Sequence, residues 1–245
     1  MKSAAFALVL ALVAGPALAQ PTHVMVRARS LDAKFIGDHT GGVRVVLRDA
    51  RTGKVLAQGL TRGGTGDTAR IMKTPLVRGA PLADAATAGF DAVIDIDRPT
   101  LVRAEAKGPM GRPASAVEVT STLWVIPGRD VTGDGWVLSF PGLVVEPART
   151  RVDGPGLRID AKVSPMCGCP IEPAGLWDAG DYTVEAFVLK GDKVVSRTAL
   201  AYAGTTGEFT GVAPATGPGR YRLRVVASDA KTPNAGVWEG PLAAR

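Results

Sequence analysis

Residues 117–125, Val117-Glu118-Val119-Thr120-Ser121-Thr122-Leu123-Trp124-Val125, place an aliphatic side chain at almost every second position. Side chains of an extended strand point alternately to opposite faces of a sheet, so this pattern predicts a strand with one buried face. Short turns rich in glycine separate this stretch from others of the same kind. The same period of two recurs in residues 24–29, 43–48, 93–96, 101–106, 157–163, 182–189, 194–200, 208–212 and 221–227.

The composition agrees with many short strands. The chain has 245 residues, of which 46% are hydrophobic and 21% are charged, so it can bury a sizeable core. Its 30 glycines and 18 prolines argue against a helical bundle, because both residue types interrupt helices and form turns. We therefore expect an all-β protein with two consecutive immunoglobulin-like antiparallel β-sandwich domains.

The N-terminus resembles a secretory signal peptide. Lys2 is followed by an apolar run and by the small-x-small sequence Ala17-Leu18-Ala19, which predicts cleavage before Gln20. The apolar run is shorter than the roughly 20 residues that span a bilayer, and no later stretch approaches that length. These features predict that residues 1–19 are a signal peptide. They also predict that the mature protein is soluble, is exported to the periplasm and is not inserted in a membrane.

Proline and glycine mark a division inside the predicted mature chain. Residues 141–155 contain Pro141, Pro147 and Pro155 around the apolar run Leu143-Val144-Val145, which is typical of a linker or of a strand that crosses between domains. We expect an N-terminal β-sandwich domain over residues 20–147. A C-terminal immunoglobulin-like domain, which carries the cysteines, is expected over residues 148–245.

Three further segments have recognisable patterns. Residues 130–135 copy the opening of a calcium loop, but its twelfth position is Pro141 where a bidentate glutamate is needed, so a turn is favoured over calcium. Residues 80–89 are rich in alanine and are expected to contain one short helical turn. The third segment, residues 63–68, is rich in glycine but lacks the lysine of a phosphate-binding loop and is expected to be a plain loop.

The C-terminal strands carry a family resemblance. Residues 218–229, Pro-Gly-Arg-Tyr-Arg-Leu-Arg-Val-Val-Ala-Ser-Asp, followed by Asn234-Ala235-Gly236, resemble the last two strands of bacterial immunoglobulin-like and fibronectin-like domains. The resemblance implies a sandwich fold, with Tyr221 at the tyrosine-corner position and without the inter-sheet disulfide of antibody domains. Such domains commonly serve as binding or spacing modules, so it supports a fold and not an activity.

The densest chemical feature is the segment Pro165-Met166-Cys167-Gly168-Cys169-Pro170, which holds both cysteines of the chain. Soft sulfur ligands select Cu(I), zinc or iron–sulfur clusters, and an adjacent thioether favours Cu(I). Cys167 and Cys169 are therefore predicted as Cu(I) ligands, with Met166 as a third. His23, near the predicted mature N-terminus, is a further candidate ligand.

Three functions compete for this segment. The first is periplasmic Cu(I) binding or delivery, and the second is a non-catalytic module that binds a protein partner through a loop shaped by a Cys167–Cys169 disulfide. The third is thiol redox exchange. Sequence motifs for hydrolases, phosphate-binding loops and dinucleotide-binding loops are missing from the chain, so we do not expect an enzyme.

The distribution of charged residues argues against a nucleic acid as the binding partner. The formal net charge is +6, with 29 basic and 23 acidic residues interspersed along the chain. A basic run with interleaved aromatic residues, typical of proteins that follow a phosphate backbone, does not occur. The expected partner is therefore a protein, still unidentified, and not a nucleic acid.

Overall fold

The computed structural model of the protein describes residues 19–242. All but the last residue of the predicted signal peptide, residues 1–19, lies outside this range. The described chain is mostly β, as the alternating pattern predicts. Its helical segments are three 3₁₀ turns and one five-residue π-helix, η2 (Ala69–Lys73). Within residues 19–242 no helix has the length and apolar character needed to cross a membrane.

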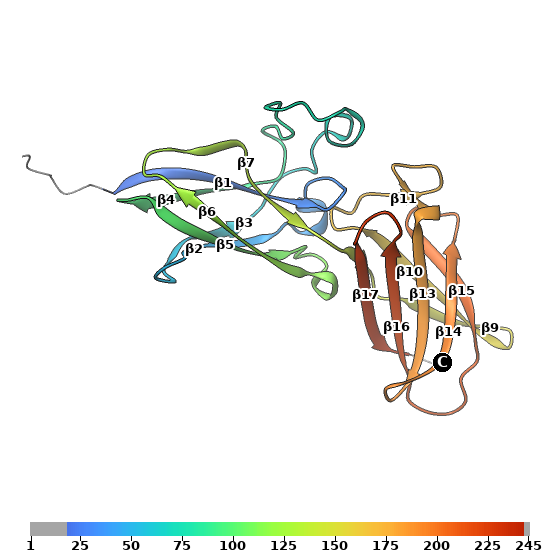
Figure 1. Ribbon diagram of the computed structural model, residues 1–245. Helices are drawn as coiled ribbons and strands as arrows, with labels where there is room; N and C mark the ends of the chain where they lie inside the picture. Colours follow the sequence, from blue (N-terminus) through green and yellow to red (C-terminus); the bar gives the residue numbers. More distant parts are fainter. Residues whose placement is uncertain (1–18, 243–245) are drawn as a thin grey trace, which may run out of the picture.

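The first half of the chain forms two sheets that enclose a common core (Figure 1). The strand orders are β4-β1-β7 and β3-β2-β5-β6. Their bounds are β1 (Gln20–Ser30), β2 (Arg44–Asp49), β3 (Val55–Leu60), β4 (Phe90–Ile96), β5 (Thr100–Gly108), β6 (Val117–Val125) and β7 (Val131–Phe140).

One pairing departs from the expected antiparallel arrangement. β1 pairs antiparallel with β4 but parallel with β7, where Val26 lies opposite Trp136 and Ser30 opposite Phe140. The side-chain period of two is the same in both kinds of ladder, so alternation in the sequence cannot distinguish them. β2 and β3 pair antiparallel and form a hairpin around residues 49–54.

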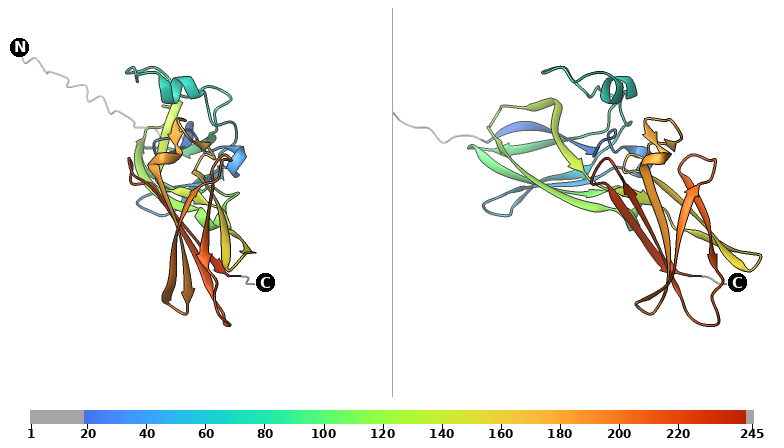
Figure 2. Two further views of the ribbon diagram at one scale, coloured as in Figure 1. Left: turned by 90° about the vertical axis from the view of Figure 1, so that its right-hand side faces the viewer. Right: turned by 45° about the vertical axis from the view of Figure 1, so that its right-hand side comes forward.

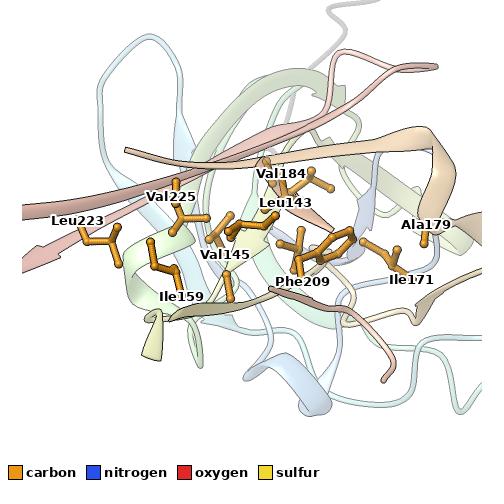
Figure 3. Packing of buried hydrophobic residues seen from close by; sticks show 14 of the residues in the cluster. Leu143, Val145, Ile159, Ile171, Ala179, Val184, Phe209, Leu223 and Val225 are labelled. Atoms are coloured by element: carbon orange, nitrogen blue, oxygen red, sulfur yellow. The ribbon is translucent and has the colours of Figure 1, made fainter. Parts of the chain in front are cut away.

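The second half forms one continuous antiparallel sheet with the order β17-β16-β13-β14-β15-β10-β8, which curls until β17 packs against β8. β9 pairs with the outer part of β10. Figure 3 shows the buried side chains inside this nearly closed sheet, among them Ile159, Phe209 and Val225. The bounds are β8 (Leu143–Val145), β9 (Arg149–Asp153), β10 (Gly156–Pro165), β13 (Tyr182–Lys190), β14 (Lys193–Tyr202), β15 (Glu208–Pro214), β16 (Arg222–Asp229) and β17 (Ala235–Pro241).

The proline-rich segment after β7 is a strand and not a free linker. β8 pairs with the end of β10, with Val145 opposite Val163 and Leu143 opposite Pro165. Leu143 and Val145 belong to the core of the second half, whereas Val144, which points the other way, belongs to the core of the first half. The sheet of the second half thus starts at Leu143, ahead of the expected division after Pro147. The strand β8 contributes side chains to both cores.

A long loop projects from the first half between β3 and β4 (teal in Figures 1 and 2). Its short helix is η2, earlier than the expected helical turn within residues 80–89, which contains turns and bends instead. The calcium-like residues 130–135 lie at the start of β7, where the Asp134 carboxylate accepts hydrogen bonds from the backbone of Leu82 and Ala83 at 2.9 and 2.7 Å. That carboxylate holds the loop and is occupied by protein donors.

Candidate functional site

The Cys-Gly-Cys segment lies between the two halves of the molecule. Cys167 and Cys169 form a disulfide with an S–S distance of 2.05 Å, and both belong to the core of the second half. Their side chains are almost completely buried, with residue exposures of 1% and 3%. Met166 is buried as well, but it packs into the core of the first half. Three neighbouring residues therefore connect two separate cores.

A turn at the end of β1 receives hydrogen bonds from three segments of the second half. The Ser30 hydroxyl accepts from the backbone N–H of Met166 at 3.2 Å. The Asp32 carbonyl accepts from the indole Nε1–H of Trp177 at 3.1 Å, and the Leu31 carbonyl accepts from Asn234 Nδ2 at 3.0 Å. These donors come from widely separated parts of the sequence, so this turn is the meeting point of the two halves.

Asn234 uses both ends of its amide at this junction. Its Nδ2 donates to Leu31, while its Oδ1 accepts from the backbone N–H of Gly142 at 2.7 Å. Asn234 is only 4% exposed. A buried amide with both donor and acceptor satisfied fixes the geometry around it, because any relative movement would leave a polar group unpaired. The junction is therefore a specific interface and not a hinge of free backbone.

A recess of about 260 Å³ opens beside the disulfide. Cys169 lines it, together with cationic side chains from both halves, Arg112 and Lys162. Arg112 Nε pairs with the Glu146 carboxylate at 3.2 Å. Buried Thr40 also lines the recess, and its Oγ1 has no hydrogen-bond partner among the described residues. The recess offers hydrogen-bond donors and one ion pair next to a disulfide sulfur.

Two of the predicted ligands, His23 and Met166, do not join the cysteine pair. His23 Nδ1 lies 3.1 Å from an Asp91 carboxylate oxygen on the neighbouring strand, and both side chains are about half exposed. It precedes Ser30 by seven positions in the extended strand β1, which corresponds to roughly 23 Å. His23 therefore does not approach the cysteines, and Met166 faces the opposite core.

His39, in the 3₁₀ turn Asp38–Thr40, reaches the cysteine loop. Gly168 adopts a positive φ of 74°, and a Cβ at this position would lie 2.5 Å from Cδ2 and 3.0 Å from Nε2 of His39. The imidazole thus rests on the glycine between the two cysteines. Sequence reasoning missed this contact because no local pattern connects residues so far apart in the chain.

The donor set does not fit a Cu(I) ion while the disulfide is closed. Cu(I) is bound by thiolates or thioethers, and the two cysteine sulfurs are here bonded to each other. Among residues 19–242 there is no group of three or more histidine, cysteine, aspartate or glutamate side chains arranged to hold a metal ion. Binding of Cu(I) at this loop would require prior reduction of the disulfide.

The fold and the junction define the class of molecule: a mostly β protein whose two sheet assemblies meet at a buried disulfide loop. No protein-family model matches the chain, and no curated protein matches it. Two similar solved structures are DUF3823 family proteins. The one from Parabacteroides merdae ATCC 43184 has 11% identity and a TM-score of 0.31, over 91% of this chain and 99% of that chain. The other, from Bacteroides ovatus ATCC 8483, has 10% identity and a TM-score of 0.34, over 89% and 97%.

Proposed function

We propose that this chain is an exported, non-catalytic interaction protein in which a Cys167–Cys169 disulfide shapes the loop at the junction of two immunoglobulin-like domains. The observation that carries the proposal is the burial of the disulfide at the junction, with exposures of 1% and 3%. A disulfide that is almost completely buried is suited to a structural role. Binding proteins gain from such preorganisation, because less conformational freedom is lost when the partner docks.

The immunoglobulin-like part of the proposal rests on the C-terminal strands. Residues 222–229 and 235–241 form the antiparallel pair β16–β17, in the region that resembles the end of immunoglobulin-like domains. Tyr221 stands directly before β16, and its ring lies 5.7 Å from the Lys190 ammonium nitrogen. A periplasmic address would also favour the disulfide, since that compartment is oxidising.

Intact mass spectrometry of protein purified from the periplasm, with and without thiol alkylation, tests the structural role of the disulfide on which this proposal rests. We expect a mass lower by two hydrogens than the dithiol form, no alkylation without reductant, and no bound copper or zinc in elemental analysis. The matched control is the Cys167→Ser/Cys169→Ser variant, which cannot be alkylated. Two alkylated thiols together with stoichiometric copper would refute the structural role of the disulfide.

Cu(I) binding is a second candidate function, and the position of His39 favours it. After reduction, the thiols of Cys167 and Cys169 would lie beside an imidazole that already contacts Gly168. Titration of the reduced protein with Cu(I) in competition with a chromogenic chelator measures this directly. Loss of binding in His39→Ala, and not in His23→Ala, would support a site built around the loop.

Thiol exchange, the third candidate, would begin at Cys169, the cysteine that lines the recess. The rate at which dithiothreitol reduces the protein tests it, with the unfolded chain as reference. Reduction as fast as in the unfolded chain would support exchange, whereas strong protection would contradict it, because buried disulfides react slowly.

A further inference from the structure

The loop between β3 and β4 ends in an exposed apolar tip. Leu76 and Val77 are 70% and 68% exposed, the highest values for large apolar side chains among the described residues. They follow η2 in the loop between β3 and β4, and this loop projects from the first half in both views of Figure 2. Adjacent exposed aliphatic side chains at the end of a projection are not a by-product of core packing.

Basic side chains surround this tip. Arg70, Lys73 and Arg78 are exposed, and the sequence between Asp67 and Asp84 contains no acidic residue. The two flanking aspartates are engaged in the base of the loop, where Asp67 Oδ1 accepts from the backbone of Arg70 and Asp84 Oδ1 accepts from the Thr87 hydroxyl. Residues 68–83 therefore combine exposed aliphatic side chains with positive charge and contain no acidic side chain.

The base of the loop is held rigidly. Ile71 and Ala83, on its two sides, pack with Phe35 in a small apolar cluster. Arg27, only 5% exposed, donates to the carbonyl oxygens of Thr87 and Ala88 beneath them. Long loops that are ordered in this way, and not left as flexible connections, commonly carry a function.

We propose that the loop is a peripheral membrane anchor, in which Leu76 and Val77 enter the headgroup boundary of an anionic phospholipid surface and the three basic side chains contact lipid phosphates. Aliphatic tips with flanking cations bind such surfaces by burying apolar area and by attraction to anionic headgroups. A small convex tip with two apolar side chains offers far less area than a typical protein interface of about 800 Å² per partner. The inference goes beyond the proposed function and does not depend on it.

Flotation with phospholipid vesicles tests the anchor. We expect the protein to float with vesicles of phosphatidylglycerol and phosphatidylcholine in equal parts, to stay behind with phosphatidylcholine alone, and to detach as salt increases. Leu76→Ser/Val77→Ser keeps every charge and should weaken binding by roughly tenfold or more. Val152→Ser, which changes an equally exposed aliphatic side chain in β9, should bind like the wild type.

Insertion of the tip is measured by fluorescence. Leu76→Trp should shift its emission to shorter wavelength on addition of the anionic vesicles, whereas Val152→Trp should not. Equal binding of wild type and the double serine variant would overturn the proposal, since the protein's positive charge would then suffice. Failure to float with either kind of vesicle would also overturn the proposal. The tip would then be a candidate binding surface for a protein partner instead of a membrane.

Discussion

Arg27 stabilises the projecting loop from below. Its guanidinium, buried beneath residues 84–88, donates to three backbone carbonyls, at 2.9 Å for Ala88 and 3.5 Å for Asp84, with Thr87 as the third. Burial lowers the pKa of Arg27, and the charges of Asp134 and Asp84 oppose this effect. The arginine remains charged at neutral pH, so its bonds to carbonyls are charge-assisted.

Replacement of this arginine should be costly. We expect Arg27→Met to lower the free energy of unfolding by about 2–3 kcal/mol, because it leaves buried carbonyls without donors. Arg44→Met, at an exposed position of β2, should change it by less than about 0.5 kcal/mol. Urea denaturation of both variants measures the difference. Equal stability of the two variants would show that the loop does not need its buried cation.

Asp84 makes part of the stability dependent on pH. The hydrogen bond from the Thr87 hydroxyl, more than any other contact, lowers the pKa of Asp84, and the backbone of Ala86 acts in the same direction. A carboxylate whose pKa falls on folding stabilises the protein above its unfolded pKa of about 3.9. That contribution is lost as the pH falls through the lowered folded value.

We therefore expect the wild type to lose more stability between pH 7 and pH 3 than Asp84→Asn, which has no carboxyl group to titrate. Thr87→Val should reduce the pH dependence as well, because it removes the principal hydrogen bond. Urea denaturation series at both pH values provide the comparison. If the three proteins lost the same amount of stability on acidification, this coupling would be absent.

At the residue scale the sequence identified the cysteine loop but not its neighbours. Cys167 and Cys169 were recognisable because they are the only cysteines and lie two positions apart. His39 and Asn234 reach the same junction through tertiary contacts that no local spacing encodes. His23 has a metal-binding side chain and lies near the predicted mature N-terminus. The strand β1 carries it away from the cysteines.

Gly168, in the loop after β10, permits a close approach of His39, and Gly154, in the turn between β9 and β10, provides a comparison. Gly168 and Gly154 both have positive φ angles, 74° and 55°. A Cβ at residue 168 would meet His39 and Thr40, whereas a Cβ at residue 154 would meet nothing within 4 Å. A comparison of alanine at these two positions therefore separates the free-energy cost of the left-handed backbone from the cost of the steric clash.

We expect Gly154→Ala to lower the free energy of unfolding by about 1 kcal/mol, the cost of a left-handed alanine. Gly168→Ala should lower it by about 2–4 kcal/mol, because crowding adds to the same backbone cost. Addition of His39→Ala to Gly168→Ala should restore about 1 kcal/mol, since the imidazole is the nearest obstacle. Chemical denaturation measures all three, and equal effects of the two glycine variants would contradict the close contact.

At the scale of the element, alternation predicted most strands but not their connections. Residues 117–125 form β6 over the full stretch that the pattern indicates. Strand order and direction depend on contacts across the molecule, so the parallel β1–β7 pair and the single curled sheet of the second half were not foreseen. Leu143-Val144-Val145 is apolar without alternation because its two faces enter different cores.

The whole molecule behaves as two cores connected by shared residues. Met166 and Val144 pack into the core of the first half, although Val144 lies in β8 and Met166 directly follows β10, two strands of the second half. The Ser30–Ala33 turn, in return, places Ala33 in the core of the second half and accepts hydrogen bonds from Met166 and Trp177. Neither half can unfold without exposing side chains and breaking hydrogen bonds that belong to the other.

Differential scanning calorimetry should therefore show one unfolding transition. Met166→Ala and Leu223→Ala, which alter different cores, should each destabilise the protein by about 2–5 kcal/mol. At about 2–4 °C per kcal/mol for a protein of this size, both should lower the same transition by several degrees. Independent halves would instead give two transitions, with Met166→Ala shifting one of them and Leu223→Ala the other, because each core would then melt according to its own packing alone.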